Sequence, residues 1–598
     1  MVVPNMQGLK QLAANSRVSV IGGGISGLSF AYFLGKLRPD VRVTVYEQQG
    51  RVGGYIQTNR ASEQTQKQTR CVGERALKME KGPRTLRGVS PGTLIIVDLL
   101  KKMGRLGQLR GVHVGSKGNR KYLVKRSGDG DAQVGSVRGE LIEVPGPGCR
   151  LSTVGKFLAS DLGRVGLAGF AKDLFFRPAA GDEERLDRMS VEEFFTRHFG
   201  RRMITDIGSA LMYGIYAADV ADLNVQSVMP GLVELERQEG SVARAMLKRL
   251  FRARPRDDAS KRPSALDEDL QLYVDRLGSD FDLANLAVLL KKFPMLAMTD
   301  GLSTLCEGLR GSLPGNVTVV TDSGVEKIST AGAGGAPVVT FDDGREEACD
   351  HVRSTTNAQV FGGLVADTAP ELARQLAEFR YTSVTVCNVL IPQREVKQYE
   401  GFGFLVPKAR FSKDARVMGV IFDSDVEEHS SVLFPAGVAR GLPPVLVAGG
   451  STAAAEPPSA ETRAALQAVE REIVGREDPR PAADQFTKVT FMLNVAGPRA
   501  PPVSQLRQVV AETFANLLGG GPLPPGWALE RTTLRDSIPL YDVAGEGFPR
   551  RRVAVETALG KRFGGRVSVG GMTFARGIGV PDAVVSSLRA AAALAGGA

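Results

Sequence analysis

Residues 18–47 read VSVIGGGISGLSFAYFLGKLRPDVRVTVYE, and this stretch decides the fold. A β-branched run enters a glycine turn, a helix-forming segment follows, and a second β-branched run ends on Glu47, twenty residues after Gly27, the last glycine of the turn. The order strand, glycine turn, helix, strand and acid predicts a dinucleotide-binding unit. The turn and the first residues of the helix are Gly22, Gly23, Gly24, Ile25, Ser26 and Gly27.

Each glycine of this pattern, and the acid that follows it, has a physical task. Gly22 allows the tight turn, Gly24 lets the backbone approach a pyrophosphate, and Gly27 lets the helix pack close to the strand. The free N–H groups and the positive dipole end of the helix face the phosphates. Glu47 can accept hydrogen bonds from ribose hydroxyls and would repel a 2′-phosphate, which argues against NADP.

The segment after Glu47 separates FAD from NAD. It reads Gln48-Gln49-Gly50-Arg51-Val52-Gly53-Gly54, and Glu80-Lys81-Gly82-Pro83-Arg84 follows later. The first run resembles the second fingerprint of the flavin-containing amine oxidase superfamily, in which Arg51 would neutralise pyrophosphate and the glycines would pass under the flavin. The alternative is an ordinary glycine turn with a solvated arginine.

The other end of the chain supports a flavin site. A short strand at 567–569 runs into glycines and then into a helix that has Pro581 at its start and Asp582 in its first turn. Its positive end suits the C2 carbonyl of a flavin. A strand and turn predicted at 316–325 make Val325 a candidate backbone contact to adenine. The C-terminal cofactor candidates are Gly571, Gly577, Gly579, Val580 and Pro581.

Most of the chain resembles the protoporphyrinogen oxidase family. The resemblance rests on a series of motifs from end to end: GGGISGL at 22–28, RVGG at 51–54, EKGPRTLRG at 80–88, GNRKYL at 118–123, YGIYAAD at 213–219, MPGL at 229–232, the segment 236–241, GFGFLVP at 401–407, IPLY at 538–541 and GIGVPDAV at 577–584. The eukaryotic, fungal-like type fits best. The resemblance implies FAD-dependent oxidation of protoporphyrinogen IX, the penultimate step of haem biosynthesis, with O2 as the acceptor and a quinone as the alternative acceptor.

The same resemblance implies an α/β fold with a Rossmann-like FAD-binding domain built from discontinuous segments, a mixed β-sheet substrate domain and a helical membrane-associated domain. The expected FAD-binding parts are 1–112, 293–359 and 536–598. The expected helical membrane-binding domain is 113–230, and the expected substrate-binding parts are 231–292, with a charged insertion, and 360–535.

Composition agrees with this architecture. A chain of 598 residues with 43% hydrophobic content is too long for one core. Its five cysteines form no CxxC pair, and only four histidines are present, so neither metal nor triad chemistry is expected. The net charge of +11 comes from dispersed basic residues without interleaved aromatics. We therefore expect an anionic substrate and an anionic membrane surface as partners, and no nucleic acid.

A membrane contact is expected at 151–176. No stretch of the chain approaches the roughly twenty apolar residues that a spanning helix needs. Residues 151–176 instead carry apolar residues at helical spacing with Lys156, Arg164 and Lys172 among them. This pattern fits either an interfacial amphipathic segment or a pair of core helices. The family resemblance favours the membrane, peripherally at the intermembrane-space face of the mitochondrial inner membrane, and also implies a homodimer and ferrochelatase as a partner.

The substrate needs apolar walls for a flat tetrapyrrole and cations for its propionates. By the resemblance, Arg120 is the first candidate for a propionate anchor, and Arg84 is a candidate for the flavin edge or the substrate side. Gly214 is a candidate for offering a backbone carbonyl to a pyrrole N–H, which requires close approach. The candidate wall residues are Phe402, Gly403, Leu405 and Val447.

Three other functions stay open at this point. An amine oxidase typically frames its flavin with an aromatic pair, whereas the single tryptophan, Trp527, lies outside every cofactor motif. Coproporphyrinogen oxidation is the same chemistry on a substrate with more carboxylates. A non-enzymatic binding or escort module would not need Glu47, RVGG and the C-terminal glycines together. The charged insertion at 246–282 is expected to be a disordered surface loop.

Overall fold

The computed structural model describes most of the chain. The described residues are 9–71, 73–126, 139–177, 185–186, 188–252, 267–330, 335–394, 396–408, 416–435, 442–448, 459–476, 486–495, 500–519 and 521–596.

A five-stranded parallel sheet carries the predicted nucleotide-binding pattern. Its strand order is β10-β2-β1-β14-β21, and Val18 pairs with Val43 on one side and with His351 on the other. The strands come from the beginning, the middle and the end of the chain, as the sequence predicts. They are β1 (Arg17–Ile21), β2 (Arg42–Tyr46), β10 (Val317–Val320), β14 (His351–Ser354) and β21 (Val567–Val569).

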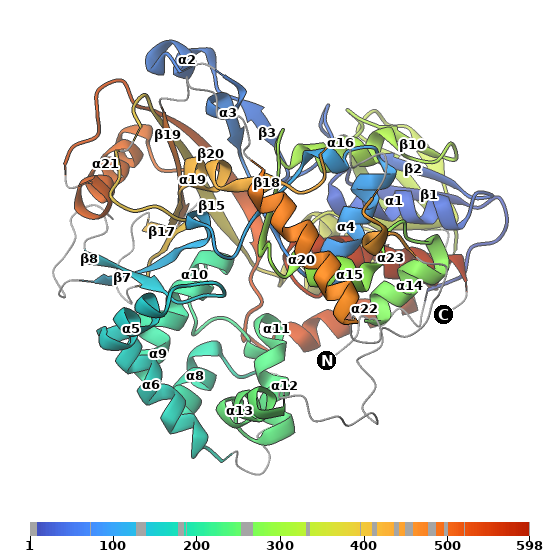
Figure 1. Cartoon of the computed structure of the whole chain (residues 1–598). Coiled ribbons are helices and arrows are strands. Elements are labelled where there is room, and N and C mark those ends of the chain that lie inside the picture. Colours follow the sequence, from blue (N-terminus) through green and yellow to red (C-terminus); the bar gives the residue numbers. More distant parts are fainter. Residues whose placement is uncertain are drawn as a thin grey trace.

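Three helices cover one face of this sheet, α1 (Ile25–Leu37), α4 (Pro91–Lys102) and α23 (Val580–Ala595) (Figure 1). The Ser587 hydroxyl donates to the Ser26 carbonyl at 2.9 Å, which locks the last helix of the chain to the first. A Cβ on Gly92 would lie 2.1 Å from the Pro581 carbonyl oxygen, so α4 approaches the start of α23 very closely. The two ends of the chain therefore share one core.

A second sheet is mixed, as expected for a substrate domain. Its order is β20-β15-β19-β17-β16-β7-β8; β16 and β7 pair in parallel and the other neighbours pair antiparallel. The strands are β7 (Lys121–Arg126), β8 (Gly139–Val144), β15 (Tyr381–Ile391), β16 (Gly403–Leu405), β17 (Arg416–Ile421), β19 (Thr487–Asn494) and β20 (Ala528–Pro539). Strands β7 and β8 thus belong to this sheet, although 113–230 was expected to be helical.

Smaller sheets join these two. An antiparallel sheet of β11 (Val325–Thr330), β12 (Pro337–Phe341) and β13 (Glu346–Ala348) packs Phe341 against Tyr46 with ring centroids 4.6 Å apart. A four-stranded antiparallel sheet has the order β18-β6-β9-β5, and β3 pairs with β4. These strands are β3 (Thr58–Arg60), β4 (Lys78–Glu80), β5 (Leu86–Arg87), β6 (Leu109–Val112), β9 (Met295–Met298) and β18 (Ser430–Val432).

Helices gather at one end of the molecule, at the lower left of Figure 1. They surround His198, whose buried ring bonds Asp173 and stacks on Phe194. Residues 151–176 form two helices, as their spacing predicts. The helices of this part are α5 (Leu151–Ala159), α6 (Asp161–Leu174), α8 (Val191–Phe199), α9 (Arg201–Met203), α10 (Ser209–Tyr216), α11 (Val225–Val228), α12 (Pro230–Glu239) and α13 (Val242–Arg252), with a π-helical turn at Ile204–Gly208.

The expectation of a disordered loop at 246–282 is wrong for much of that segment. Helix α13 continues to Arg252, and α14 (Glu268–Leu277) packs into the core of the cofactor domain. The buried Tyr273 hydroxyl donates to Asp98 at 2.6 Å, and Asp269 pairs with Arg589 of α23. Asp269, the last residue of the acidic run, is therefore buried against a partner, whereas Asp267 and Glu268 are exposed, and 253–266 lie outside the described residues.

The remaining helices connect these layers. They are α2 (Glu63–Thr69), α3 (Glu74–Leu77), α15 (Leu283–Leu290), α16 (Ser303–Gly311), α17 (Ala358–Leu364), α18 (Pro370–Ala377), α19 (Asp423–Glu428), α20 (Ala460–Gly475), α21 (Val503–Thr513) and α22 (Phe548–Phe563). Within the described parts of the chain, no helix has both the length and the apolar character needed to cross a membrane.

Candidate functional site

The first glycine turn has the geometry that the sequence predicts. Gly22 adopts φ = +101°, a left-handed conformation that favours glycine, and its N–H donates to the Tyr46 carbonyl at 2.8 Å. A Cβ on Gly27 would lie 2.0 Å from the Gly22 carbonyl oxygen. The start of α1 can therefore sit this close to the end of β1 because residue 27 has no side chain.

Glu47 stands at the carboxyl end of β2, beside this turn. Its carboxylate accepts the Gly23 N–H at 2.8 Å and the Gln49 N–H at 2.9 Å. These bonds fix the carboxylate at the mouth of the turn, where an acid recognises ribose hydroxyls. The next residues follow the same edge, since the Ser323 N–H donates to the Glu47 carbonyl at 3.0 Å and Gly324 approaches Gln48. Val325, the first residue of β11, therefore lies next to the 47–50 segment.

The RVGG turn lies against the first glycine turn. The Gly53 N–H donates to the Gly23 carbonyl at 2.9 Å, and Gly24 and Gly53 form a parallel bridge. A Cβ on Gly54 would lie 3.3 Å from the Gly24 Cα, so side chains would close the space between the two turns. The half-buried Arg51 donates to the Gly54 carbonyl at 3.0 Å, which orders the turn.

The C-terminal glycine segment completes the same edge of the sheet. The Thr355 hydroxyl lies 2.9 Å from the Ile21 carbonyl oxygen, and the Thr355 carbonyl oxygen would lie 2.9 Å from a Cβ on Gly571, whose φ is +79°. Thr355 thereby joins the ends of β1, β14 and β21. Sequence reasoning missed this residue; its position directly after a buried strand is the feature that could have indicated it.

The start of α23 is capped as expected. The Gly579 N–H donates to Asp582 at 3.1 Å, and a Cβ on Gly577 would lie 2.5 Å from the same carboxylate. Val580 and Pro581 begin the helix and are buried. Burial raises the pKa of Asp582 above its ordinary value. The backbone at the start of α23 is therefore ordered by the helix's own capping residue.

The EKGPR loop lies on the RVGG turn. A Cβ on Gly82 would lie 2.0 Å from the Tyr55 carbonyl oxygen. From the same loop, Arg84 donates to Asp423 of α19 at 2.8 Å, and the two side chains are 8% and 11% exposed. Pro83 stands between these two anchor points. Arg84 is thus a buried ion-pair partner in the structure, and its predicted role at the flavin edge or on the substrate side stays a prediction.

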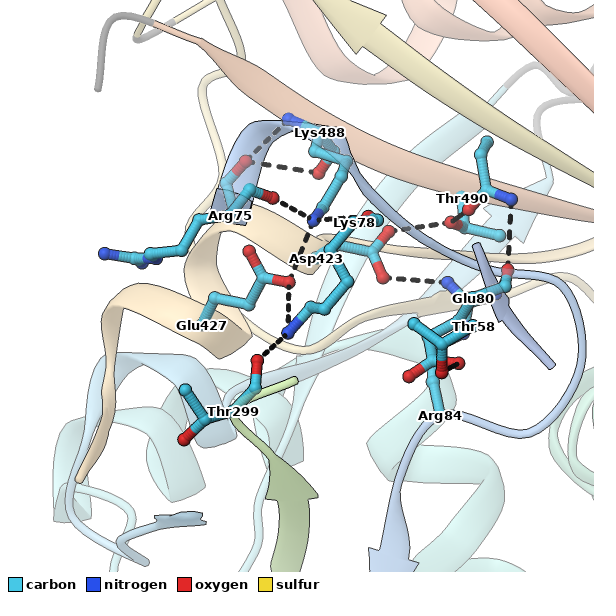
Figure 2. Close-up of polar contacts among 12 residues, drawn as sticks. Thr58, Arg75, Lys78, Glu80, Arg84, Thr299, Asp423, Glu427, Lys488 and Thr490 are labelled. Carbon is cyan, nitrogen blue, oxygen red and sulfur yellow. Dashed lines mark hydrogen bonds and ion pairs between the residues drawn. The ribbon is translucent and has the colours of Figure 1, made fainter. Parts of the chain in front are cut away.

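Figure 2 shows that this ion pair belongs to a larger polar network, which joins strands β3 and β4 and the EKGPR loop to α19 and to β19 of the mixed sheet. Asp423 also accepts the Thr490 hydroxyl at 2.7 Å, and Asn388 donates to the Glu80 carbonyl at 3.0 Å. Nearby, Glu427 pairs with Lys488 at 2.8 Å and with Lys78 at 3.3 Å. Burial alone would raise the pKa of Glu427, but the two lysines lower it to about 2. Helix α19 therefore ties the EKGPR loop to the substrate sheet.

The structure brings together several predicted substrate residues. A Cβ on Gly214 of α10 would lie 2.5 Å from the Leu405 side chain, so helix and strand touch there. The Phe402 N–H donates to the Arg120 carbonyl at 2.7 Å, and Gly403 pairs with Lys121. The NR and GFG motifs are therefore adjacent on strands β7 and β16.

Asp425, which the sequence did not indicate, fixes the segment that leads into the GFG motif. Its carboxylate accepts the Gly401 N–H at 2.8 Å and lies 2.6 Å from the Lys397 ammonium nitrogen. Val447 does not lie with the other predicted wall residues. It forms an isolated antiparallel β-bridge with Phe281 and is 46% exposed. The structure thus places Val447 beside α14 and α15 rather than beside Leu405.

The residues at the carboxyl edge of the parallel sheet fit FAD. The RVGG turn lies against the first glycine turn, the start of α1 has no side-chain cap on its N–H groups, and Glu47 stands at the ribose position. No cluster of at least three His, Cys, Asp or Glu with metal-binding geometry is found among the described residues. The five cysteines are all free thiols.

Comparison with known proteins identifies the family. Residues 25–595 match the model of the flavin-containing amine oxidoreductases. The chain is 30% identical to a protoporphyrinogen oxidase from Saccharomyces cerevisiae over 96% of its length and 97% of the relative. It is 26% identical to a coproporphyrinogen III oxidase from Staphylococcus aureus over 65% of this chain and 71% of that one. A crystal structure of a proposed protoporphyrinogen oxidase from an Exiguobacterium species superposes with a TM-score of 0.62 at 18% identity, covering 97% of this chain and 98% of that one.

Proposed function

The chain belongs to the flavin-containing amine oxidoreductases and, among them, to the protoporphyrinogen oxidases, and we propose that it oxidises protoporphyrinogen IX to protoporphyrin IX. It is a flavoenzyme that uses FAD. Three two-electron oxidations remove six electrons from the substrate, and three O2 molecules accept them and give three H2O2. The observation that carries the proposal is the meeting of RVGG, EKGPR and the C-terminal glycines on one Rossmann-type sheet, with the NR and GFG motifs paired on the adjoining sheet.

In this reaction the protein binds and orients the cofactor and the substrate, and it excludes water from them. Bound FAD supplies the acceptor for the hydride that leaves the substrate carbon. Glu47, Arg51 and the glycine turns hold the cofactor, and α19 fixes the EKGPR loop through Asp423. No acid–base dyad is required of the side chains, because the hard step belongs to the cofactor.

Substrate recognition is assigned to the group around Arg120. Its guanidinium provides a cation for a propionate, since arginine matches carboxylate geometry with paired N–H groups. Leu405 and Phe402 supply apolar surface for the macrocycle, and Gly214 allows helix α10 to come close to Leu405. The pairing of β7 with β16 holds these residues in register.

Helices α5 and α6 support a proposal of membrane association. Leu151 is 89% exposed and Phe175 is 84% exposed, and Leu158 and Leu167 are also exposed. Such apolar side chains on helices that also carry exposed Lys156, Arg164 and Lys172 suit an anionic membrane surface.

Three finer proposals rest on the family resemblance alone. They are a peripheral site at the intermembrane-space face of the mitochondrial inner membrane, a homodimer, and contact with ferrochelatase.

The test of the proposed function is anaerobic mixing of the purified protein with protoporphyrinogen IX. The flavin absorbance should bleach, and porphyrin fluorescence with H2O2 should appear when air is admitted. A parallel sample with coproporphyrinogen III measures kcat/KM for the substrate with more carboxylates, because one relative acts on it by name. A flavin that stays oxidised with protoporphyrinogen IX would contradict the proposal.

A further inference from the structure

Arg353 is a charged residue in the middle of the parallel sheet. It lies on β14, where it pairs in register with Val20 of β1 and with Ser568 of β21, and it is 3% exposed. A central strand of such a sheet is normally apolar, because helices cover both faces. The charge therefore lies in the core of the nucleotide-binding unit.

The guanidinium is packed between an aromatic ring and a glycine. Its Cζ lies 5.3 Å from the ring centroid of Phe30 in α1. A Cβ on Gly570 would lie 2.7 Å from one Nη of Arg353, so the guanidinium rests against the glycine backbone. Any larger residue at 570 would displace it. The charge thus occupies the layer between α1 and the C-terminal glycine segment.

No hydrogen bond or ion pair to the Arg353 guanidinium is found among the described residues, and its Nε is buried without an acceptor. The carboxylate that acts on it electrostatically, Glu556, already accepts a hydrogen bond from Arg552 at 3.1 Å. Burying a charge without a partner is strongly unfavourable. An unpaired cation in this position therefore weakens the protein on its own.

The neighbouring basic residue on the same strand behaves differently. His351 is also buried, and burial lowers its pKa to about 3, so its ring is neutral and bonds the Ser568 hydroxyl at 2.8 Å. Burial lowers the pKa of Arg353 to about 10, which leaves the guanidinium protonated at neutral pH. The strand thus carries one basic residue that gives up its charge and one that keeps it.

The position of Arg353 relates the charge to the cofactor edge. Two residues after Arg353 and directly after the end of β14, Thr355 contacts Gly22 and Gly571, so it joins the first and the last glycine turns. Gly570, against which the guanidinium rests, is the residue before Gly571. The unpaired cation therefore lies directly behind the place where the backbone turns for the dinucleotide meet.

We propose that Arg353 provides a buried positive charge that stabilises the anionic FAD and that FAD in turn compensates this charge. The inference rests on the assignment of FAD to this edge of the sheet. It extends that assignment to a residue that lies behind the turns rather than in a glycine motif. The apoprotein is then destabilised by Arg353, and cofactor binding removes that penalty, because a ligand that binds the folded state alone stabilises it.

The test compares apoprotein and holoprotein of three variants by thermal unfolding and by FAD titration. Arg353→Met removes the charge and keeps an unbranched side chain. Arg353→Lys keeps the charge, and Val352→Ala removes buried volume from the adjacent position of the strand, whose side chain points to the opposite face. If Arg353→Met fails to fold, Arg353→Gln takes its place under the same criteria.

We expect the Arg353→Met apoprotein to melt at a higher temperature than the wild-type apoprotein. The variant should bind FAD at least about tenfold more weakly than wild type, because one charge-assisted interaction is lost. Arg353→Lys should bind FAD within about threefold of wild type, since it retains the charge. Val352→Ala should lower the melting temperature of both forms without changing FAD affinity. The inference is overturned if Arg353→Met binds FAD as tightly as wild type, or if Arg353→Lys loses FAD to the same extent. Oxidation of protoporphyrinogen by the wild-type protein is measured separately, so that a failure of the proposed function is distinguished from a failure of this inference.

Discussion

Replacing Arg84 by methionine tests whether this residue is a structural anchor or a substrate contact. Its guanidinium donates to Asp423 at 2.8 Å inside the network of Figure 2, with 8% of its side chain exposed. Methionine fills similar volume without charge. The variant therefore leaves Asp423 buried, and among the described residues the Thr490 hydroxyl remains as its hydrogen-bond donor.

The expected magnitude follows from the burial of both side chains. Removing one member of a buried ion pair destabilises by about 3–5 kcal/mol, because the other charge is left uncompensated. Thr490 still donates to Asp423 at 2.7 Å, which places the loss near the lower end, about 3 kcal/mol. Replacing both partners with apolar residues removes the uncompensated charge, so Arg84→Met with Asp423→Leu should recover most of that loss.

The assay is urea unfolding of the holoprotein, with steady-state kinetics on each single variant and on the double variant. We expect a lower urea midpoint in Arg84→Met and a midpoint closer to wild type in the double variant. Any decrease in kcat/KM should be proportional to the loss of bound flavin. A free energy of unfolding unchanged within about 1 kcal/mol, together with a raised KM at full flavin content, would refute this reasoning and assign Arg84 to the substrate.

Three further predictions test other parts of the site. Gly27→Ala should lose FAD, because its Cβ would lie 2.0 Å from the Gly22 carbonyl, whereas Gly560→Ala in α22, with no atom within 4 Å, should gain about 0.5–1 kcal/mol of stability. Glu427 has a pKa of about 2 when folded, so its contribution to stability is present at neutral pH and is lost as pH falls below about 4.5 toward 2. Glu427→Gln should flatten acid unfolding over that interval, as followed by circular dichroism. Arg120→Ala should raise KM for protoporphyrinogen IX at unchanged flavin content; loss of flavin would show that its side chain belongs to the cofactor site.

The parallel sheet and its glycine turns could be predicted because their determinants are local. Strand β1, the turn at Gly22 and the acid at Glu47 follow from side-chain type and spacing within thirty residues. The start of the C-terminal helix could also be predicted from the sequence, because Pro581 and Asp582 are typical of a first helical turn. The family resemblance then connected segments that lie far apart in sequence.

What the sequence did not reveal depends on contacts between distant segments. Helix α14 carries an acidic start that is typical of a surface, yet Asp269 meets Arg589 and Tyr273 meets Asp98 in the interior. Helix α19 is similarly acidic, and its partners come from other elements. Arg353 is the opposite case. A charged residue in a strand suggests that the strand lies at the edge of a sheet, and only the neighbouring strands show that it does not.

The account depends most directly on FAD binding at the meeting point of the three glycine turns. The decisive measurement is the ratio of FAD to chain in the purified protein, obtained from its visible absorbance before and after denaturation. We expect a yellow protein with one FAD per chain. A colourless protein that takes up no FAD when the cofactor is supplied in excess would contradict the central claim.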